Sequence, residues 1–425
     1  MKTVQLQKNK DKNWEYLSSK QELKNPLVLA FGNRYLLENP NIYNDVKELF
    51  PNGHIVFGST SGDITSKSVE DESVTITAIE FEKSQFLIKT SNVLNADLDS
   101  FKTGHDLIKQ LPSEGLKFVY VISDGSFING SQLTKGMNTA TDDNILITGG
   151  LCGDAARFKK TLASYNENPK QGEIVAIGFY GETLEVTFSI HGGWTPFGPE
   201  RIVTKSQSNI LYELDNQPAL DLYKKYLGEK AKELPGAALL YPLNVKSVDE
   251  KQSIVRTILN INEEDHAMIL AGDIPENSKV QLMMSNVDNI ANASERAARQ
   301  ALELRENEPQ LALLVSCIGR KLVLDQRVEE EIEEVELDKE GKLFVQQVLG
   351  TFLSYARAVV CTMLVALSAI ASKRACPVKK TMEKVADWQI DHFSETYSGH
   401  DKPHHQLDWT NGALYVGMVK LAAME

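Results

Sequence analysis

A glycine-rich segment that carries one acid and one base, ITGGLCGDAARF from Ile145, has the residue types best suited to binding a small molecule. Gly149 and Gly150 let a ligand approach the backbone closely, because glycine has no side chain. Asp154 and Arg157 could pair with the ammonium and carboxylate groups of a zwitterion, which suits an amino-acid-like ligand. Asp154 also suits the N-cap of a helix, so a structural role stays open. The glycine spacing is neither that of a P-loop nor GxGxxG, which argues against a nucleotide site.

The second candidate segment is an aromatic loop, HGGWTPFGP, which begins at His191. His191 offers a titratable group and Trp194 a stacking surface, so the two could form one wall of a ligand pocket. The alternative is structural: Trp194 fills the interface between two domains, and His191 caps the end of a strand. Tyr212 is a further candidate for ligand binding, although core packing is the favoured interpretation for its ring and for that of Tyr223.

Motifs of catalysis are missing from the first 335 residues, which contain neither GxSxG nor HExxH. Ser123 stands in a Ser-Asp-Gly turn that more simply ends a strand. The acidic run 329–336 has Val328, Ile332 and Val335 at helical spacing, which predicts a solvated helix face and not a metal site. We therefore predict a protein without catalytic residues, enzymatic activity or a bound metal.

Apolar periodicity indicates the elements that must position these segments. Strands are predicted over 27–31, 73–81, 118–123, 145–148, 174–179, 254–259, 267–270, 279–284 and 311–316, with SCIGRKLVL from Ser316 continuing as strand. Helices are predicted over 44–50, 101–111, 130–136, 220–228 and 292–304. The mixed order predicts an α+β fold, with two mixed α/β-type domains over 1–218 and 219–340.

Composition narrows the class of protein. A chain of 425 residues with 42% apolar and 24% charged residues is typical of a folded protein of two domains. Its formal charge of −13 makes nucleic acid an unlikely partner, since no stretch of lysine and arginine offsets it. The four cysteines lack CxxC spacing, and Cys152 and Cys317 are interpreted as small buried hydrophobes. The amino terminus has no apolar core of a signal peptide, so a cytoplasmic location is expected.

Six segments in order resemble the FIST amino- and carboxyl-terminal domains over residues 20–335. They are GSTSGDI from Gly58, VISDGSFINGSQL from Val121, the GGLCGDAARF turn, the HGGWTPFGP loop, NILYELDNQPAL and SCIGRKLVL. The resemblance implies a sensory protein in signal transduction, which binds a small ligand such as an amino acid or related metabolite and has no catalysis of its own. It also implies a signalling partner in trans, such as a histidine kinase or cyclase.

Some FIST-family members bind haem and sense nitric oxide, which gives an alternative to the small-metabolite sensor. Haem iron in proteins is held by an axial histidine, cysteine, methionine or tyrosine. His191 is the natural candidate for that ligand if the alternative applies, and otherwise no cofactor is predicted.

The carboxyl-terminal residues depart from the FIST pattern. Residues 341–379 form an apolar segment that resembles a signal peptide or a membrane span, with 349–371 as the span. Residues 380–425, with DWTNGALYVGM from Asp408, resemble the first helices of unsaturated rhamnogalacturonyl or glucuronyl hydrolases, which are (α/α)6 barrels. A helical extension is therefore predicted, and a truncated or fused hydrolase remnant is a second alternative. The last FIST strands are not found, which predicts an incomplete sheet edge in the second domain.

Overall fold

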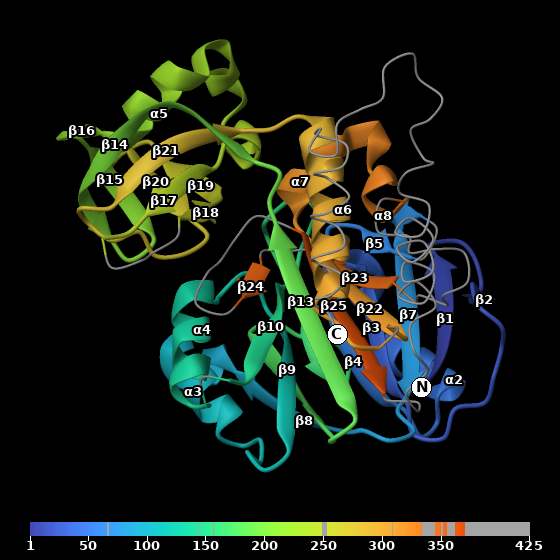
Figure 1. Cartoon of the computed structure of the whole chain (residues 1–425). Coiled ribbons are helices and arrows are strands. Elements are labelled where there is room, and N and C mark those ends of the chain that lie inside the picture. Colours follow the sequence, from blue (N-terminus) through green and yellow to red (C-terminus); the bar gives the residue numbers. More distant parts are fainter. Residues whose placement is uncertain are drawn as a thin grey trace, which may run out of the picture. The chain divides into compact units, whose positions relative to one another are not determined.

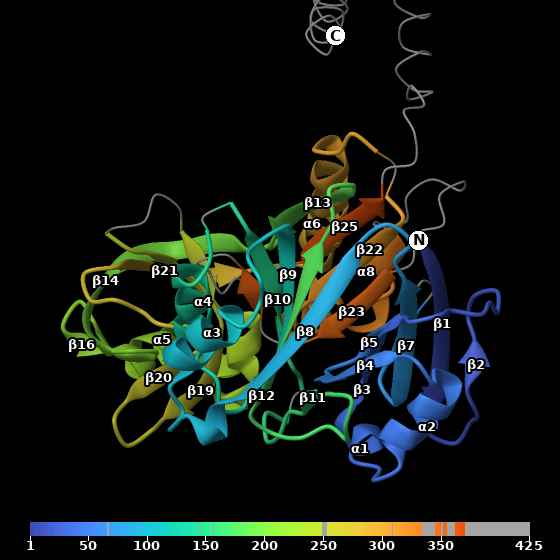
Figure 2. The same ribbon diagram turned by 90° about the horizontal axis from the view of Figure 1, so that it is seen from below.

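A computed structural model describes residues 1–65, 68–142, 144–155, 157–248, 253–307, 309–333, 345–349, 352–354 and 362–369. Residues 1–369 form one compact unit. It is a mixed α/β protein built from several sheets (Figures 1 and 2). The helical extension and the hydrolase-like segment predicted for 380–425 lie outside the described residues.

The first sheet shows why continuous apolar runs form the central strands. Leu27, Leu29 and Phe31 point into one core, and Val28 and Ala30 into another on the opposite face. A strand buried on both faces reads as an unbroken apolar run. The sheet has the order β11-β4-β3-β7-β1-β2. Its strands are β1 (Lys2–Asn9), β2 (Glu15–Tyr16), β3 (Leu27–Asn33), β4 (His54–Thr60), β7 (Ser73–Glu80) and β11 (Ala163–Tyr165). Helices α1 (Arg34–Leu37) and α2 (Ile42–Leu49) follow β3, and the hairpin β5 (Asp63–Ile64) and β6 (Val69–Glu70) follows β4.

The second sheet follows the same rule. Phe118 and Tyr120 face the core shared with the first sheet, and Val119 and Val121 face a core covered by two helices. Its order is β24-β10-β9-β12-β8. The strands are β8 (Gln85–Asn92), β9 (Leu116–Ser123), β10 (Leu146–Leu151), β12 (Glu173–Tyr180) and β24 (Phe352–Ser354). Its helices are η1 (Val93–Asn95), α3 (Ser100–Ile108) and α4 (Gly130–Thr139), and the latter two pack together (Figure 1).

The third sheet overturns the prediction of an incomplete edge. Its order is β13-β25-β22-β23, so two strands from the segment predicted to be signal-like complete it. The strands are β13 (Leu184–His191), β22 (Leu311–Ser316), β23 (Val345–Leu349) and β25 (Thr362–Ala369). Helix α6 (Val287–Glu303) packs against β13 and β25 (Figure 1). Among the described residues, no helix is long and apolar enough to cross a membrane. Within the predicted span 349–371, the described residues after β23 form the strands β24 and β25.

A separate β-rich unit is inserted between β13 and α6. All its core residues lie between positions 203 and 282, and its sheet has the order β18-β17-β21-β14-β15-β20-β19, with β16 beside β15. The sheet crosses position 218, where the sequence places a domain boundary. Its strands are β14 (Thr195–Gln207), β15 (Ile210–Leu214), β16 (Gln217–Pro218), β17 (Leu243–Lys246), β18 (Ile254–Arg256), β19 (Ile258–Asn262), β20 (Ala267–Leu270) and β21 (Lys279–Met284). Its helices are α5 (Ala219–Leu227), η2 (Gly228–Glu233) and η3 (Gly236–Leu240).

Two predictions near position 320 are wrong. The strand ends at Ser316, and Ile318–Leu324 form helix α7 in place of the predicted strand. The acidic run that follows η4 (Asp325–Arg327) includes α8 (Glu330–Glu333), but this helix is not a purely solvated face. Glu331 is buried and accepts a hydrogen bond from the fully buried Arg320 at 2.7 Å. A buried guanidinium requires such a partner. The pattern of apolar and charged residues along the helix does not show that one of its glutamates is buried.

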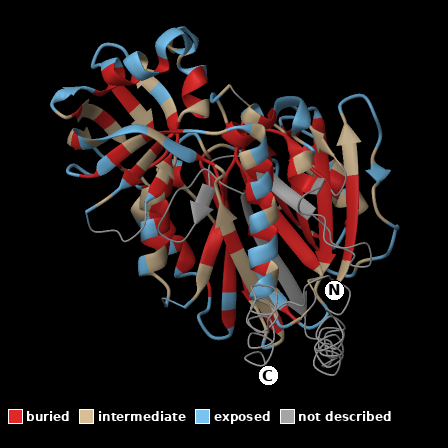
Figure 3. Ribbon diagram, turned by 45° about the horizontal axis from the view of Figure 1, so that its top comes forward, coloured by how far each residue is buried: buried red, intermediate tan, exposed pale blue. Residues whose placement is uncertain are grey.

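Burial follows these layers closely. The central strands β3, β4, β9, β12 and β22 are buried along most of their length, whereas β8 and β13 are largely half-buried (Figure 3). One apolar layer is shared by the three sheets, and it includes Leu313 of β22 beside residues of β3, β9 and β12.

Candidate functional site

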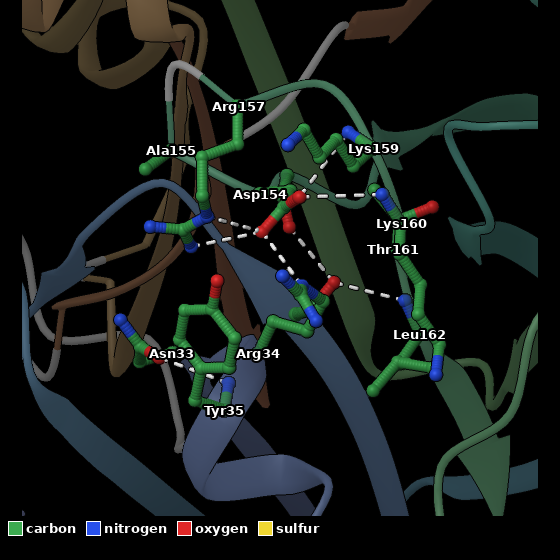
Figure 4. A network of polar contacts seen from close by, with 12 residues as sticks. Asn33, Arg34, Tyr35, Asp154, Ala155, Arg157, Lys159, Lys160, Thr161 and Leu162 are labelled. Atoms are coloured by element: carbon green, nitrogen blue, oxygen red, sulfur yellow. Dashed lines mark hydrogen bonds and ion pairs between the residues drawn. The ribbon is translucent and has the colours of Figure 1, made fainter.

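The turn after β10 is built around the carboxylate of Asp154 (Figure 4). Arg34 Nε and Arg157 Nε donate to its Oδ1 at 2.8 and 2.9 Å. The backbone N–H groups of Lys159 and Lys160 donate to its Oδ2, each at 3.2 Å. No helix begins at Asp154, so the N-cap alternative is wrong. The carboxylate closes a turn of its own, and both of its oxygens are occupied.

The charge of Asp154 is stabilised although its side chain is fully buried. Burial alone would raise the pKa of Asp154, but hydrogen bonds from Arg34 and Arg157 outweigh it and hold the pKa below its usual value of 3.8. Glu38 extends the network, since it accepts from Arg34 and pairs with Lys160. Asp154 is therefore ionised near neutral pH.

The backbone of this turn is strained where it meets the surface. Ala155 and Phe158 have φ values of 49° and 51°, a left-handed conformation that is rare for residues other than glycine. Such strain persists only where surrounding bonds enforce it, and it gathers at ligand-binding sites. Here Asp154 accepts hydrogen bonds from the residues on both sides of Phe158, from Arg157 Nε and from the Lys159 backbone N–H. Phe158 is 45% exposed and the Arg157 side chain 33% exposed.

Tyr35 fixes the position of the two guanidinium groups. Its ring lies 4.1 Å from Arg34 Cζ and 4.8 Å from Arg157 Cζ, so it contacts both cations. Asn33 Oδ1 accepts from the Tyr35 backbone N–H at 3.0 Å and begins α1 there. The end of β3 therefore supports the turn that follows β10.

A cleft of about 480 Å³ opens beside this turn. This volume lies within the range of small-molecule sites, which are mostly apolar with a few polar groups. The turn forms one wall, the η2–η3 segment and β19 form another, and α7 contributes one residue. The lining residues are Arg157, Phe158, Glu233, Pro235, Gly236, Ala237, Leu239, Leu240, Leu259, Asn260 and Leu322.

Hydrogen bonds lead away from the turn toward the start of α4. Thr161, next to Lys160, donates to Asp124 Oδ2 at 2.9 Å. Asp124 Oδ1 accepts from the backbone N–H groups of Ser126 and Phe127. The loop before α4 is therefore fixed to the Asp154 turn.

The start of α4 is in turn bonded to the inserted unit. Asn129, the N-cap of α4, donates to Asp273 Oδ1 at 2.9 Å, and Gln132 donates to Asp273 Oδ2. Arg256 Nε donates to the Asp273 carbonyl at 3.1 Å and Nη2 to Ser131 Oγ at 3.3 Å. Arg256 ends β18, directly before the β19 residues that line the cleft. These groups of hydrogen bonds, joined by short chain segments, thus link the Asp154 turn to the end of β18.

Gly149 and Gly150 do not reach the cleft. They lie in β10, between β9 and β24, where Gly149 has φ 150°. A Cβ on Gly149 would stand 1.8 Å from the carbonyl oxygen of Val121. At Gly149 the missing side chain therefore makes room for the neighbouring strand β9 and not for a ligand.

The aromatic candidates also lie apart from the cleft. His191 Nε2 is 2.8 Å from Gln300 Oε1, at the end of β13. Trp194 is buried against Met283 and Cys317, where the chain passes into the inserted unit. Tyr212 lies in β15, with Lys205 Nζ 5.5 Å from its ring centre. Trp194 lies where its structural alternative places it, and Tyr223 is buried as core packing requires. Tyr212 is half-buried and lies outside the core clusters.

Sequence reasoning predicted Arg157, which lines the cleft, but missed the residues that hold it and the cleft itself. Arg34 and Tyr35 stand more than a hundred positions earlier in the chain, and their role depends on the pairing of sheets. Pro235 and Leu259 belong to segments without a polar motif. The one sequence signal for Arg34 and Tyr35 is the Asn-Arg-Tyr sequence at the end of β3. An N-cap residue directly after a buried strand indicates that the chain leaves the core there and that polar side chains gather at that end of the sheet.

The fold and the cleft define a class: a mixed α/β protein whose inserted β-rich unit shares a small-molecule-sized cleft with the sheets that carry it. The chain matches the FIST N domain over residues 26–217 and the FIST C domain over residues 219–344, and it belongs to the FIST family. The resemblance found in the sequence is confirmed. FIST domains are classed as sensory and signalling domains, and neither match is to a catalytic family or to a hydrolase.

Two further comparisons describe relatives. An uncharacterized protein of Methanocaldococcus jannaschii, MJ1623, is 24% identical over 210 residues, which are 45% of this chain and 39% of that protein. The chain thus matches about two fifths of that relative's length. Among solved structures, cyanuric acid hydrolase from A. caulinodans aligns with 81% of this chain and 90% of its own, at 6% identity and TM-score 0.32. A second cyanuric acid hydrolase gives 8% identity, TM-score 0.30 and coverage of 81% and 91%. Similarities this low carry no argument about function.

Proposed function

We propose that this protein is a sensor that binds a small organic ligand in the cleft beside Arg157. The observation that carries the proposal is the strained turn: a saturated, buried carboxylate holds Arg157 and Phe158 at the surface of a cleft of about 480 Å³. Arg157 anchors a carboxylate of the ligand, because charge-assisted bonds to a guanidinium are short and strong. The ligand class proposed on this basis is that of organic acids, with amino acids and related metabolites among them.

The readout is proposed to pass through the linked groups of hydrogen bonds between the two walls. A ligand that contacts both Arg157 and Asn260 touches the Asp154 turn and β19, and the hydrogen bonds above link that turn to the end of the preceding strand, β18. It therefore favours one arrangement of the inserted unit over others, and ligands act by such differences in affinity. A partner protein in trans, such as a histidine kinase or cyclase, would detect the arrangement.

Haem sensing gains no support from the site. The described residues that line the cleft include no histidine, cysteine, methionine or tyrosine, which are the usual axial ligands. His191, the candidate axial ligand, is bonded to Gln300 on another part of the structure.

The test is a thermal-shift screen of the full chain with amino acids and organic acids, followed by calorimetry on Arg157→Gln. We expect at least one compound to raise Tm saturably. The substitution should weaken its binding by about tenfold to a hundredfold, since a hydrogen bond to a charged group contributes about 1.5–3 kcal/mol.

Arg299→Gln is the matched control, because Arg299 lies exposed on α6 in an ion pair with Glu295 and does not line the cleft. It should bind like the wild type. Equal loss in both variants, or full binding by Arg157→Gln, would contradict a site at this cleft.

A further inference from the structure

We propose that the cleft recognises a monocarboxylic acid with an apolar body, through its carboxylate alone, and that an α-amino group adds nothing to recognition. This inference rests on the proposed function and narrows the ligand class. It is carried by the distribution of unused polar groups around the cleft.

The cation that faces the cleft has donors to spare. Arg157 Nε donates to Asp154 Oδ1, and this is the one hydrogen bond that its guanidinium makes among the described residues. Nη2 lies 2.8 Å from the same oxygen as part of the ion pair but makes no hydrogen bond to a described residue. The linked ion pairs around it contain three cations, Arg34, Arg157 and Lys160, and two carboxylates, Asp154 and Glu38, which leaves one positive charge uncompensated. One anionic group of a ligand balances that charge.

A ligand ammonium finds no comparable partner. Asp154 is fully buried, and all four of its hydrogen bonds come from the protein. Glu233 also lines the cleft, but its side chain is 56% exposed and paired with Lys230 at 2.8 Å. A half-exposed carboxylate that already has a partner contributes little to binding.

Phosphate and dicarboxylates are also disfavoured. The backbone N–H groups of Lys159 and Lys160 could otherwise bind an anion, but both donate their hydrogen bonds to Asp154. The remaining lining is mostly apolar, and two large side chains, Phe158 and Leu322, are 45% and 39% exposed at the cleft. An apolar ligand body removes that surface from water, which stabilises the complex in proportion to the area covered.

The experiment compares matched compounds on the full chain by isothermal titration calorimetry. The aromatic set is 3-phenylpropionate, phenylalanine and 3-phenylpropanamide, and the aliphatic set is hexanoate, norleucine and hexanamide. In at least one set we expect the acid and the amino acid to bind within threefold of each other and the amide at least tenfold more weakly. In Arg157→Gln the acid should bind no better than the amide, and Arg299→Gln should behave as the wild type.

Three outcomes would overturn the inference: an amino acid that binds tenfold more tightly than its matched acid, inorganic phosphate that outcompetes the acids, or no binding in either set. In each of these cases the sensor function stands if any compound of the thermal-shift screen, the amino acids included, binds in an Arg157-dependent way. It falls together with the inference if no compound of the screen binds, or if binding does not depend on Arg157.

Discussion

Two buried carboxyl groups in this protein behave in opposite ways because of their neighbours. Asp154 meets two guanidinium groups, and its pKa is held below the usual value. Asp63 is equally buried but bonds two hydroxyl groups, Thr60 Oγ1 and Ser73 Oγ, at 2.5 and 2.6 Å. Burial raises the pKa of Asp63 from 3.8 to about 8, and the hydroxyl bonds and the charge of Lys321 offset this only in part. At neutral pH, Asp154 is therefore ionised, whereas Asp63 is mostly protonated and neutral.

The pH dependence of stability follows from Asp63. Because its folded pKa of about 8 exceeds the unfolded value of 3.8, its contribution is complete below pH 3.8 and is lost as pH rises toward 8. Between pH 5.5 and 7.5 we expect the free energy of unfolding to fall by up to about 1.4 kcal/mol per pH unit from this group.

Urea denaturation of wild type and Asp63→Asn at both pH values measures this effect. The amide keeps the size of the side chain and does not titrate, so its slope should be flatter. An unchanged slope in the variant would assign the pH dependence to other groups.

At the scale of elements, two glycines decide how α3 and α4 meet. A Cβ on Gly104 would lie 2.5 Å from the carbonyl oxygen of Leu133, and one on Gly136 would lie 2.0 Å from that of Phe101. Both contacts are with backbone, which cannot rotate away. The two helices thus pack at a separation that only glycine permits, and α4 carries the N-cap that bonds Asp273.

Gly136→Ala should therefore destabilise the protein, although alanine favours a helix by about 1 kcal/mol over glycine. Overpacking costs about 1–3 kcal/mol and here it must displace a helix, so we expect a net loss of about 1–2 kcal/mol by chemical denaturation. Gly236→Ala is the control, because open space surrounds that position. A stabilised Gly136→Ala would show that the helices can separate at little cost.

The elements best predicted from sequence are those whose pattern is local. The strand from Leu27 and the helix from Ala219 to Leu227 follow from an apolar run and from helical spacing, and the structure confirms both. Residues 318–324 were predicted wrongly because a short apolar segment fits either state, and the buried pair of Arg320 with Glu331 decides for a helix. At the site, sequence predicts Arg157, but its supports come from distant strands that only the tertiary fold brings together.

At the scale of the whole molecule, the strands after position 344 are structural. Strand β25 lies between β13 and β22 and pairs with both along most of its length. Without it, the backbone groups of two strands lose their partners and two sheet edges open. The apolar layer shared by the three sheets includes residues of both β13 and β22, so its integrity depends on this pairing.

A chain ended at residue 344 should fold poorly, whereas one ended at residue 369 should keep the fold. We expect the shorter chain to appear mainly in the insoluble fraction, or to unfold at least 10 °C lower, since losing several kcal/mol lowers Tm by a few degrees for each. Size-exclusion chromatography and calorimetry of the two chains measure this. Equal Tm values would show that β23 and β25 add nothing.

The inserted unit is attached by two chain segments that run side by side. Arg320 donates to the carbonyl of Gly192 on the incoming segment and to that of Ile290 after the outgoing one, and Ser285 Oγ bonds the carbonyl of Gly193. Two adjacent connecting segments allow the inserted unit to bend relative to the three sheets, but they resist twisting of the unit about the direction of the segments. Because the unit also has its own core, it is a cassette: a designer could exchange residues 195–284 for another small domain whose ends lie equally close, and keep the three-sheet body as its base.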